Sequence, residues 1–286
     1  MSKRSATLSS MSTPTRSIVI VVPPDRRKSM SSQPVVCIIQ ARVGSSRLPG
    51  KTLRKLGDRT VLARVLTRVG MSKAIDRIVV ATTDDPADDA IRDEALRCGV
   101  DCFRGDEFDV LARYHGAAVT FGAQHVVRVT SDCPLIDASL IDRMVEHYLK
   151  AAGRIDYLSN GLVRTFPHGL DTEIFSAAHL AIAFHEATDV AEREHVTPFL
   201  YRNPDRFRLE NFAQGSDQSQ HRWTLDEPDD LRFFEAVVDY LPDPRVSTTE
   251  VLALLEQHPE LARINASVRQ KTLAESTMTR GRRRAA

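Results

Sequence analysis

The 286-residue sequence has no apolar run that approaches the roughly 20 residues of a membrane-spanning helix. Near its start the longest apolar run is Ile18–Val22, which has five residues and is followed by two prolines, so we expect no signal peptide. Only four cysteines are present, and Cys98 and Cys102 lack the second pair or nearby histidine that a zinc site needs. We therefore expect a cytoplasmic protein without membrane insertion, whose cysteines serve packing.

Two common nucleotide-binding motifs are also missing. The P-loop pattern G-x-x-x-x-G-K-[ST] cannot be read, because Gly44 and Gly50 are six residues apart, one too many. The pattern G-x-G-x-x-G is absent as well, which removes support for a dinucleotide-binding fold. A nucleotide site in this chain would have to use another loop.

Charge is distributed unevenly along the chain. Residues 1–34 carry six Lys/Arg and one acid, and residues 276–286 carry four arginines and no acid, whereas residues 35–275 contain 29 bases and 37 acids. A nucleic-acid-binding protein would concentrate cations on its folded face, so we expect no specific nucleic-acid partner. The N-terminal segment is rich in Ser, Thr, Pro and Arg, and we expect it to be a disordered extension.

The most informative stretch runs from Val35 to Lys51, VVCIIQARVGSSRLPGK. Its first six residues form a short apolar run that predicts a buried parallel strand. The loop that follows contains glycines, serines and three cations, Arg42, Arg47 and Lys51. Open α/β sheets bind ligands at the carboxyl ends of their strands. A loop of this composition suits a polyphosphate, because glycines allow close backbone approach and fixed cations neutralise charge.

Strand and helix patterns alternate after this loop, which favours a parallel sheet with helices on both faces. Beyond residue 150 the alternation becomes irregular. The predicted strands are 35–40, 77–81, 100–103, 125–129, 170–175 and 222–226. The predicted helices are 60–69, a helix that ends at Leu96, 109–121, 137–150, 192–200 with an interruption at Pro198, 231–240 and 246–261.

Three sets of acidic residues are candidates for binding a metal ion or a ligand. Asp132 follows the strand predicted at 125–129 and is well placed to hold Mg²⁺ on a triphosphate, although S-D-C-P alone would equally be a turn. Asp171 and Glu173 either face a ligand or alternate outward from a half-buried strand. Asp226 ends the last predicted strand, where neighbouring acids are also explained as caps of the next helix.

The wording A-R-x-G-S-S-R-L-P-G-K after a first strand resembles the signature of the sugar-acid cytidylyltransferases, which include the CMP-Kdo and CMP-sialic acid synthetases. P-x-G-x-D-x-E at Pro167–Glu173 and E-R-E-H-V-T-P at Glu192–Pro198 resemble the spore-coat polysaccharide biosynthesis protein F branch. The resemblance implies an α/β, Rossmann-like (GT-A-like) fold with a mostly parallel sheet. Its domain would span residues 35–264, with an insert at about 154–215 that shapes an acceptor pocket and a homodimer contact, before a basic tail at 265–286.

The same resemblance implies a Mg²⁺-dependent nucleotidyltransferase that moves CMP from CTP to a sugar acid and releases pyrophosphate, in surface polysaccharide or glycoconjugate biosynthesis. In this family pattern Arg42, Arg47 and Lys51 neutralise the phosphates, and Mg²⁺ binds Asp132 and Asp226. Further residues are assigned to substrate binding, namely Ala41, Gly44, Ser45, Ser46, Thr82, Asp84, Arg128, Arg164, His168, Asp171 and Glu173.

Two alternatives remain open from the sequence. A glycosyltransferase could use a nucleotide-sugar donor on a similar sheet, although such enzymes usually hold metal with D-x-D, which this chain lacks. A non-catalytic nucleotide-binding subunit would be expected to have lost a cation or a metal-binding acid, and all five are present. Against Kdo itself, the metal segment reads T-S-D-C-P-L where that enzyme has a G-D-E-P-L-like run, so the acceptor stays open. The nucleotide base also stays open, because related pyrophosphorylases that act on UTP, GTP or TTP share the R-L-P-G-K-like ending.

Overall fold

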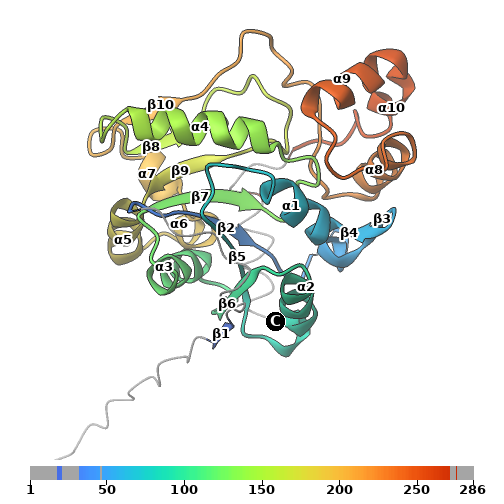
Figure 1. Cartoon of the computed structure of the whole chain (residues 1–286). Helices are drawn as coiled ribbons and strands as arrows, with labels where there is room; N and C mark the ends of the chain where they lie inside the picture. The colour runs from blue at the N-terminus through green and yellow to red at the C-terminus, as the bar shows by residue number, and fades with distance from the viewer. Residues whose placement is uncertain (1–17, 21–31, 46, 271–274, 276–286) are drawn as a thin grey trace, which may run out of the picture.

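The computed structural model describes residues 18–20, 32–45, 47–270 and 275, arranged around one eight-stranded sheet (Figure 1). The extension expected at residues 1–34 lies mostly outside the described residues, as does residue 46. The strands of the sheet, in spatial order, are β1 (Ile18–Ile20), β6 (Asp101–Gly105), β5 (Arg77–Thr83), β2 (Val35–Gln40), β7 (His125–Thr130), β9 (Glu173–Ser176), β8 (Tyr157–Ser159) and β10 (Leu209–Asn211). Strands β3 (Lys55–Leu56) and β4 (Arg59–Thr60) form a separate hairpin.

Four parallel strands form the centre of the sheet. Strand β2 pairs with β5 on one side and β7 on the other, and β5 pairs with β6. Ile38 of β2 lies opposite Val79 of β5 and Arg128 of β7. The side chains of Val35–Ile39 are buried, because a parallel strand covered on both faces requires an apolar run. The four strands predicted in the first half of the chain are therefore confirmed.

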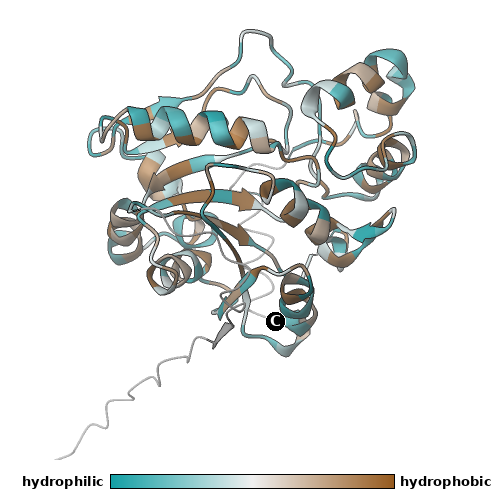
Figure 2. Cartoon of the chain, in the orientation of Figure 1, coloured by the Kyte–Doolittle hydropathy of each residue, from teal (hydrophilic) through white to brown (hydrophobic). Residues whose placement is uncertain are grey.

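Helices cover both faces of this sheet. Since successive side chains of a strand point to opposite faces, Cys37 and Ile39 join a core with α1, α4 and α8, whereas Val36 and Ile38 join a second core with α3 and α5. Figure 2 shows the hydrophobic residues concentrated along the central strands. No helix in the described part of the chain is long and apolar enough to cross a bilayer. The helices are α1 (Val61–Val69), α2 (Asp89–Arg97), α3 (Val110–Thr120), α4 (Ala138–Lys150), α5 (Ala177–Glu186), α6 (Val190–His195), α7 (Pro198–Tyr201), α8 (Pro228–Tyr240), α9 (Thr248–Gln257) and α10 (Pro259–Arg263), with 3₁₀ turns η2 (Lys51–Leu53) and η3 (Pro86–Asp88).

The segment after α4 extends the sheet with a mixed edge. Strand β9 runs antiparallel to β7, β8 runs antiparallel to β9, and β10 is parallel to β8. The predicted interruption at Pro198 separates α6 from α7, and Pro259 divides the long helix predicted at 246–261 into α9 and α10. Helix α5 was not predicted.

The strand predicted at residues 222–226 does not form. Only Arg222 is bridged, to His168, through hydrogen bonds from the His168 amide to the His221 carbonyl (2.9 Å) and from the Trp223 amide to the His168 carbonyl (2.6 Å). Gly169 follows the bridge with a φ of +101°, and a Cβ there would lie 2.0 Å from the Trp223 carbonyl oxygen. This close crossing of two loops explains why the apolar alternation of 222–226 does not produce a strand.

Asp137 connects two helices on one face of the sheet. One carboxylate oxygen accepts hydrogen bonds from the amides of Ser139 (2.8 Å) and Leu140 (3.0 Å), and so caps α4, while the other accepts from Thr248 at the start of α9. We expect Asp137→Ala to lower the free energy of unfolding by about 1–3 kcal/mol, because it removes a cap and leaves partly buried donors unpaired. Urea unfolding measures this. Asp189→Ala removes an exposed cap of the short helix α6 and should lower the free energy of unfolding by a smaller amount. If both substitutions lowered it equally, Asp137 would be only a helix cap and not a link between α4 and α9.

Candidate active site

Three segments that are distant in the sequence meet at the ammonium group of Lys51. Its Nζ donates to Oδ2 of Asp132 at 2.6 Å, to Oδ1 of Asp226 at 2.8 Å and to the carbonyl oxygen of Leu225 at 2.8 Å. Lys51 comes from the turn after the first loop, Asp132 follows β7, and Asp226 immediately precedes α8. The carboxyl ends of β2 and β7 and the segment before α8 therefore bring the predicted cation and both predicted metal-binding acids together.

The charges at this point stabilise one another. Burial opposes the charge on Lys51, but the carboxylates of Asp132 and Asp226 outweigh it and raise the pKa of Lys51 above its usual value. Burial also opposes ionisation of Asp132, and the ammonium of Lys51 with the hydroxyl of Thr130 holds the pKa of Asp132 below its usual range. Lys51 and Asp132 are consequently both charged near neutral pH.

Arg47 adds a second cation. Its guanidinium lies 3.1 Å from Oδ1 of Asp226 and 3.0 Å from Oε1 of Glu227. Burial opposes its charge, but these two carboxylates raise the pKa of Arg47. Glu227, which was not among the predicted site residues, is the N-cap of α8 in a capping box with Asp230.

Arg42 does not join this cluster. Its guanidinium lies 3.4 Å from Oε1 of Glu107, on the side of the loop towards β6. The loop backbone beside it is anchored by Asp88, which accepts a hydrogen bond from the Val43 amide at 2.6 Å and another from the Thr83 hydroxyl. Asp88 is buried and was missed, because its position in the run D-D-P-A-D-D indicates only a turn and a helix start.

The remaining predicted loop residues have mostly backbone roles in the structure. The Ala41 amide continues the pairing with β5 through the Ala81 carbonyl (3.2 Å), and the Ser45 hydroxyl accepts from the Leu48 amide (3.3 Å). A Cβ on Gly44 would meet no atom within 4 Å, so space is open beside that residue. Ser46 lies outside the described residues.

Two predicted residues follow the neighbouring strand β5. The hydroxyl of Thr82 is buried and has no hydrogen-bond partner among the described residues. The Asp84 amide donates to the Gly105 carbonyl at 2.9 Å, while its side chain is half-buried.

A buried arginine and aspartate hold Asp226 in place. Asp230 is fully buried and accepts two hydrogen bonds from Arg222, at 2.8 and 3.0 Å. The same carboxylate accepts from the amides of Asp226 and Glu227, each at 2.9 Å. Asn265 donates to Asp230 at 3.0 Å, so the segment after α10 also supports the site. The sequence suggested that Asp230 is a helix cap; the structure shows that it also orients Asp226.

A second polar group lies next to Asp132. Arg164 lies 2.5 Å from Asp171, which also accepts from the Gly169 amide at 2.9 Å. Burial raises the pKa of the Cys133 thiol well above its usual value, and the charges of Asp132 and Asp171 act in the same direction. The Cys133 thiol lies 3.6 Å from Oδ1 of Asp132. Nη1 of Arg164 is buried without a hydrogen-bond partner in the described part of the chain.

His168 lies beside this pair. Burial lowers its pKa, and the guanidinium of Arg164 lowers it further. His168 is therefore a neutral group near neutral pH, able to donate one hydrogen bond from one ring nitrogen and to accept one at the other.

Arg128 and Glu173 form an ion pair across β7 and β9, with side chains that are only 14% and 13% exposed. Glu173 also accepts from the hydroxyls of Tyr157 (2.6 Å) and Thr197 (2.8 Å), and Gln40 accepts from Arg128 at 3.2 Å. Both were predicted to bind substrate. This closed network favours a structural role instead, because it leaves little of either charge to a ligand.

The oxygen atoms around Lys51 suit a hard divalent cation. Two carboxylates and a carbonyl oxygen already surround one cation there, and oxygen ligands are those that Mg²⁺ prefers. Within the described ranges no group of three or more His, Cys, Asp or Glu side chains could hold a metal. Mg²⁺ commonly binds one or two carboxylates and completes its coordination with phosphate oxygens and water, so two acids are sufficient.

Comparison with known proteins connects this geometry to a family. The family model described as Cytidylyltransferase matches residues 36–262, which include Lys51, Asp132 and Asp226. This chain belongs to the cytidylyltransferase family. It is therefore a nucleotidyltransferase, and the alternatives of a glycosyltransferase and a non-catalytic subunit lose their support.

Individual relatives agree with this family. The cytidylyltransferase is 36% identical over 243 residues to the uncharacterized protein MJ1063 of Methanocaldococcus jannaschii, covering 84% of this chain and 98% of that protein. It is 31% identical over 237 residues to the spore coat polysaccharide biosynthesis protein SpsF of Bacillus subtilis, covering 80% and 96%. The structure of a cytidylyltransferase from Leptospira borgpetersenii is similar with a TM-score of 0.79 and 34% identity, covering 84% of this chain and 99% of that one. The predicted Rossmann-like α/β fold is confirmed.

Proposed function

We propose that this cytidylyltransferase transfers CMP from CTP to a sugar acid, with Mg²⁺ as cofactor. The convergence of Lys51, Asp132 and Asp226 carries the proposal, with Arg47 as the second cation. Cations are required to neutralise a triphosphate and the departing pyrophosphate, and acids are required to hold the metal. The catalytic domain would span residues 35–264, with the insert at about 154–215 providing the acceptor pocket and a homodimer contact.

Each residue of the site would have the following role. Arg47 and Lys51 bind the β- and γ-phosphates of CTP, and the open backbone beside Gly44 admits the nucleotide, with Thr82 and Asp84 at the edge of its site. Asp132 and Asp226 would hold Mg²⁺, which would supply positive charge beside the phosphates. An oxygen of the acceptor attacks the α-phosphorus in line, the bond to the bridging oxygen breaks, and pyrophosphate leaves with the electron pair. Positioning and charge neutralisation are sufficient for this step.

The acceptor is assigned from the group next to Asp132. Arg164 binds Asp171 through Nη2 at 2.5 Å, while its buried Nη1 has no partner among the described residues and would donate to a carboxylate oxygen of the acceptor. A neutral His168 beside it can bind a sugar hydroxyl. The likeness to SpsF, whose name places that protein in spore coat polysaccharide biosynthesis, supports a role in surface polysaccharide formation.

The experiment is an assay of pyrophosphate release from each of the four nucleoside triphosphates with a panel of sugar acids and Mg²⁺. We expect release only with CTP together with an acid-bearing sugar, and formation of the CMP-sugar by mass spectrometry. Release with a neutral sugar and not with its acid would overturn the acceptor class. Release with another nucleotide in place of CTP would overturn the choice of base.

The role of Arg164 gives a separate prediction. Arg164→Met should raise KM for the acceptor on the order of 10- to 100-fold, because a hydrogen-bonded charge pair contributes about 1.5–3 kcal/mol, and should leave KM for CTP unchanged. Steady-state kinetics with each substrate varied in turn measures this. Arg154→Met, an exposed arginine of the same insert, is the matched control. An unchanged acceptor KM in Arg164→Met would show that this guanidinium does not contact the acceptor.

A further inference from the structure

We propose that Lys51 occupies the place of the divalent cation until the nucleotide arrives, and then exchanges the carboxylates for the phosphates. The inference rests on the proposed function, because it concerns the same two acids. The ammonium of Lys51 donates to Asp132, Asp226 and the Leu225 carbonyl, and thereby uses all three of its N–H donors. No donor is left for a phosphate while these bonds persist.

The other oxygens of the two acids are also engaged. Oδ1 of Asp132 accepts from the Thr130 hydroxyl at 2.7 Å, and Oδ2 of Asp226 lies 3.5 Å from the guanidinium of Arg222. The remaining oxygens, Oδ2 of Asp132 and Oδ1 of Asp226, both accept from the Lys51 ammonium, and the second also lies 3.1 Å from the guanidinium of Arg47. A divalent cation bridging the two acids would therefore have to take the position of the ammonium, and two cations in contact at that position would repel each other.

The two acids also require a cation at all times. Their side chains are 23% and 13% exposed, and carboxylates that share a partly desolvated site repel each other unless a positive charge lies between them. Lys51 supplies that charge in the nucleotide-free enzyme. An incoming triphosphate offers oxygen acceptors to the ammonium, whose four-carbon stem allows it to move, and this frees the carboxylates. Tight metal binding is consequently coupled to nucleotide binding.

The test uses Mn²⁺ alone as a probe, with free Mn²⁺ measured by electron paramagnetic resonance. Without nucleotide, Lys51→Gln and Lys51→Met should bind Mn²⁺ at least about tenfold more tightly than the native chain, because a competing charge has been removed. The methionine variant excludes ligation by the new amide. Lys55→Gln, an exposed lysine of β3, is the control and should bind as the native chain does. A non-hydrolysable CTP analogue should strengthen Mn²⁺ binding in the native chain.

The outcomes separate this inference from the proposed function. If both Lys51 variants bind Mn²⁺ no more tightly than the native chain while the analogue still promotes binding, Lys51 is not a competitor and the exchange is overturned. If Mn²⁺ binds to none of the proteins, with or without the analogue, the metal site of the proposed function is itself wrong. Loss of the gained affinity on adding Asp226→Asn to Lys51→Gln would support the exchange at these two acids.

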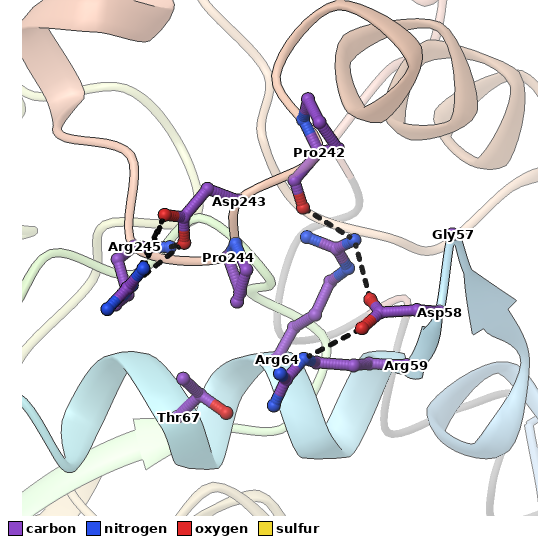
Figure 3. Close-up of a pocket in the computed structure, with 9 residues that line it drawn as sticks. All are labelled: Gly57, Asp58, Arg59, Arg64, Thr67, Pro242, Asp243, Pro244 and Arg245. Carbon is purple, nitrogen blue, oxygen red and sulfur yellow. Dashed lines mark hydrogen bonds and ion pairs between the residues drawn. The ribbon is translucent and has the colours of Figure 1, made fainter.

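A separate region of the molecule carries a second inference. A hollow of about 650 Å³, called the arginine pocket, lies between the β3–β4 turn, the outer side of α1 and the segment after α8 (Figure 3). It adjoins a second hollow of about 380 Å³ that reaches Arg97. The residues that line the arginine pocket are Gly57, Asp58, Arg59, Arg64, Thr67, Pro242, Asp243, Pro244 and Arg245.

Positive charge in and behind this pocket is incompletely neutralised. Arg64 is 5% exposed and donates to the carbonyl oxygens of Leu56 (2.7 Å) and Pro242 (3.4 Å). Among the described residues its ion-pair partner is Asp58 at 3.7 Å, which Arg59 shares. Arg68, behind it, donates only to carbonyl oxygens among its described contacts, including that of Pro244 at 2.8 Å. Burial lowers the pKa of both Arg64 and Arg68. Buried cations normally have a closely paired anion.

We infer that the arginine pocket binds a phosphate group, either as inorganic phosphate or as part of a nucleotide. Guanidinium groups form paired hydrogen bonds with phosphate oxygens, and an anion would supply the missing countercharge. The exposed cations at the mouth, Arg59 and Arg245, are paired with Asp58 at 3.3 Å and Asp243 at 2.8 Å. Their side chains are 43% and 66% exposed, so each can exchange its solvent-exposed carboxylate for a ligand. The pocket is large enough for a nucleoside monophosphate.

Calorimetric titration with inorganic phosphate and with CMP tests this inference. It is done in an Arg47→Ala background, which weakens phosphate binding at the active site. Phosphate or CMP should still bind to the Arg47→Ala protein. The affinity should fall at least about tenfold when Arg59→Ala and Arg245→Ala are added. Adding Arg206→Ala instead, at an exposed arginine paired with Glu186, should leave the affinity unchanged. Binding of phosphate alone would identify a small anion, and binding of CMP alone would identify a nucleotide. No binding of either, or binding insensitive to the two added substitutions, would overturn the inference.

Discussion

Asp132→Asn should lower turnover on the order of 10²–10³-fold or more, which is the effect of losing one group that stabilises charge in a transition state. The asparagine keeps the shape of the side chain but cannot neutralise a metal ion. Lys51 would retain Asp226 and the Leu225 carbonyl as acceptors, so the local packing should survive. Pyrophosphate release at saturating CTP measures the loss, and the melting temperature should stay within a few degrees.

Asp239→Asn provides the matched control for this variant. Asp239 is exposed on α8, the helix that follows Asp226, and the same change there should leave both turnover and melting temperature unaltered. An active Asp132→Asn enzyme would remove this carboxylate from the metal site. A collapse of the fold in the variant would show instead that Asp132 is a structural partner of Lys51.

Glu173→Gln should lower the free energy of unfolding by about 3–5 kcal/mol, because removing one partner of a buried ion pair leaves Arg128 with an uncompensated charge. Tyr157 and Thr197 would also lose a charged acceptor. Urea denaturation of the purified protein measures the change. Adding Arg128→Met should recover part of the loss, since two neutral groups in a buried site can be nearly as stable as the pair they replace.

Glu186→Gln tests whether burial causes this loss. Glu186 pairs with Arg206 at the surface, where both side chains are almost half exposed, and such pairs contribute only about 0–1 kcal/mol. If Glu173→Gln unfolded as easily as the native protein but raised KM for the acceptor, the original prediction of substrate binding at Glu173 would be correct and the structural role wrong.

The central site residues were predictable because short segments carry them. Arg47 and Lys51 belong to one loop with a distinctive composition, and Asp132 follows a strongly apolar strand, so their positions at the carboxyl edge of the sheet follow from alternation alone. Glu227 and Asp88 could not be assigned in this way. Each matches the pattern of an ordinary helix start, and its bond to the loop crosses many residues of sequence.

The strands and helices also divide into those that the sequence predicted and those that it did not. The four central strands were predictable because each is an apolar run between turns. Strands β8 and β10 have three residues each, too few for a periodic signal, and exist through pairing with neighbours in the sheet. Helix α5 reads AAHLAIAFHE, which is apolar on most sides and so lacks the alternation that reveals a surface helix. The 222–226 segment had a strand pattern but is held by a single bridge.

The amino-acid sequence by itself determined the α/β alternation and the cation-rich loop, because apolar periodicity and local composition act over a few residues. The choice of Asp132 and Asp226 as metal-binding acids came from the resemblance to the cytidylyltransferases and not from periodicity. Only the tertiary structure decided which of the charged side chains pair with one another. It placed the Lys51 ammonium between Asp132 and Asp226, directed Arg42 to Glu107, and closed Arg128 onto Glu173. Electrostatic partners are chosen by distance and burial in space, and neither is encoded in the spacing of residues along the chain.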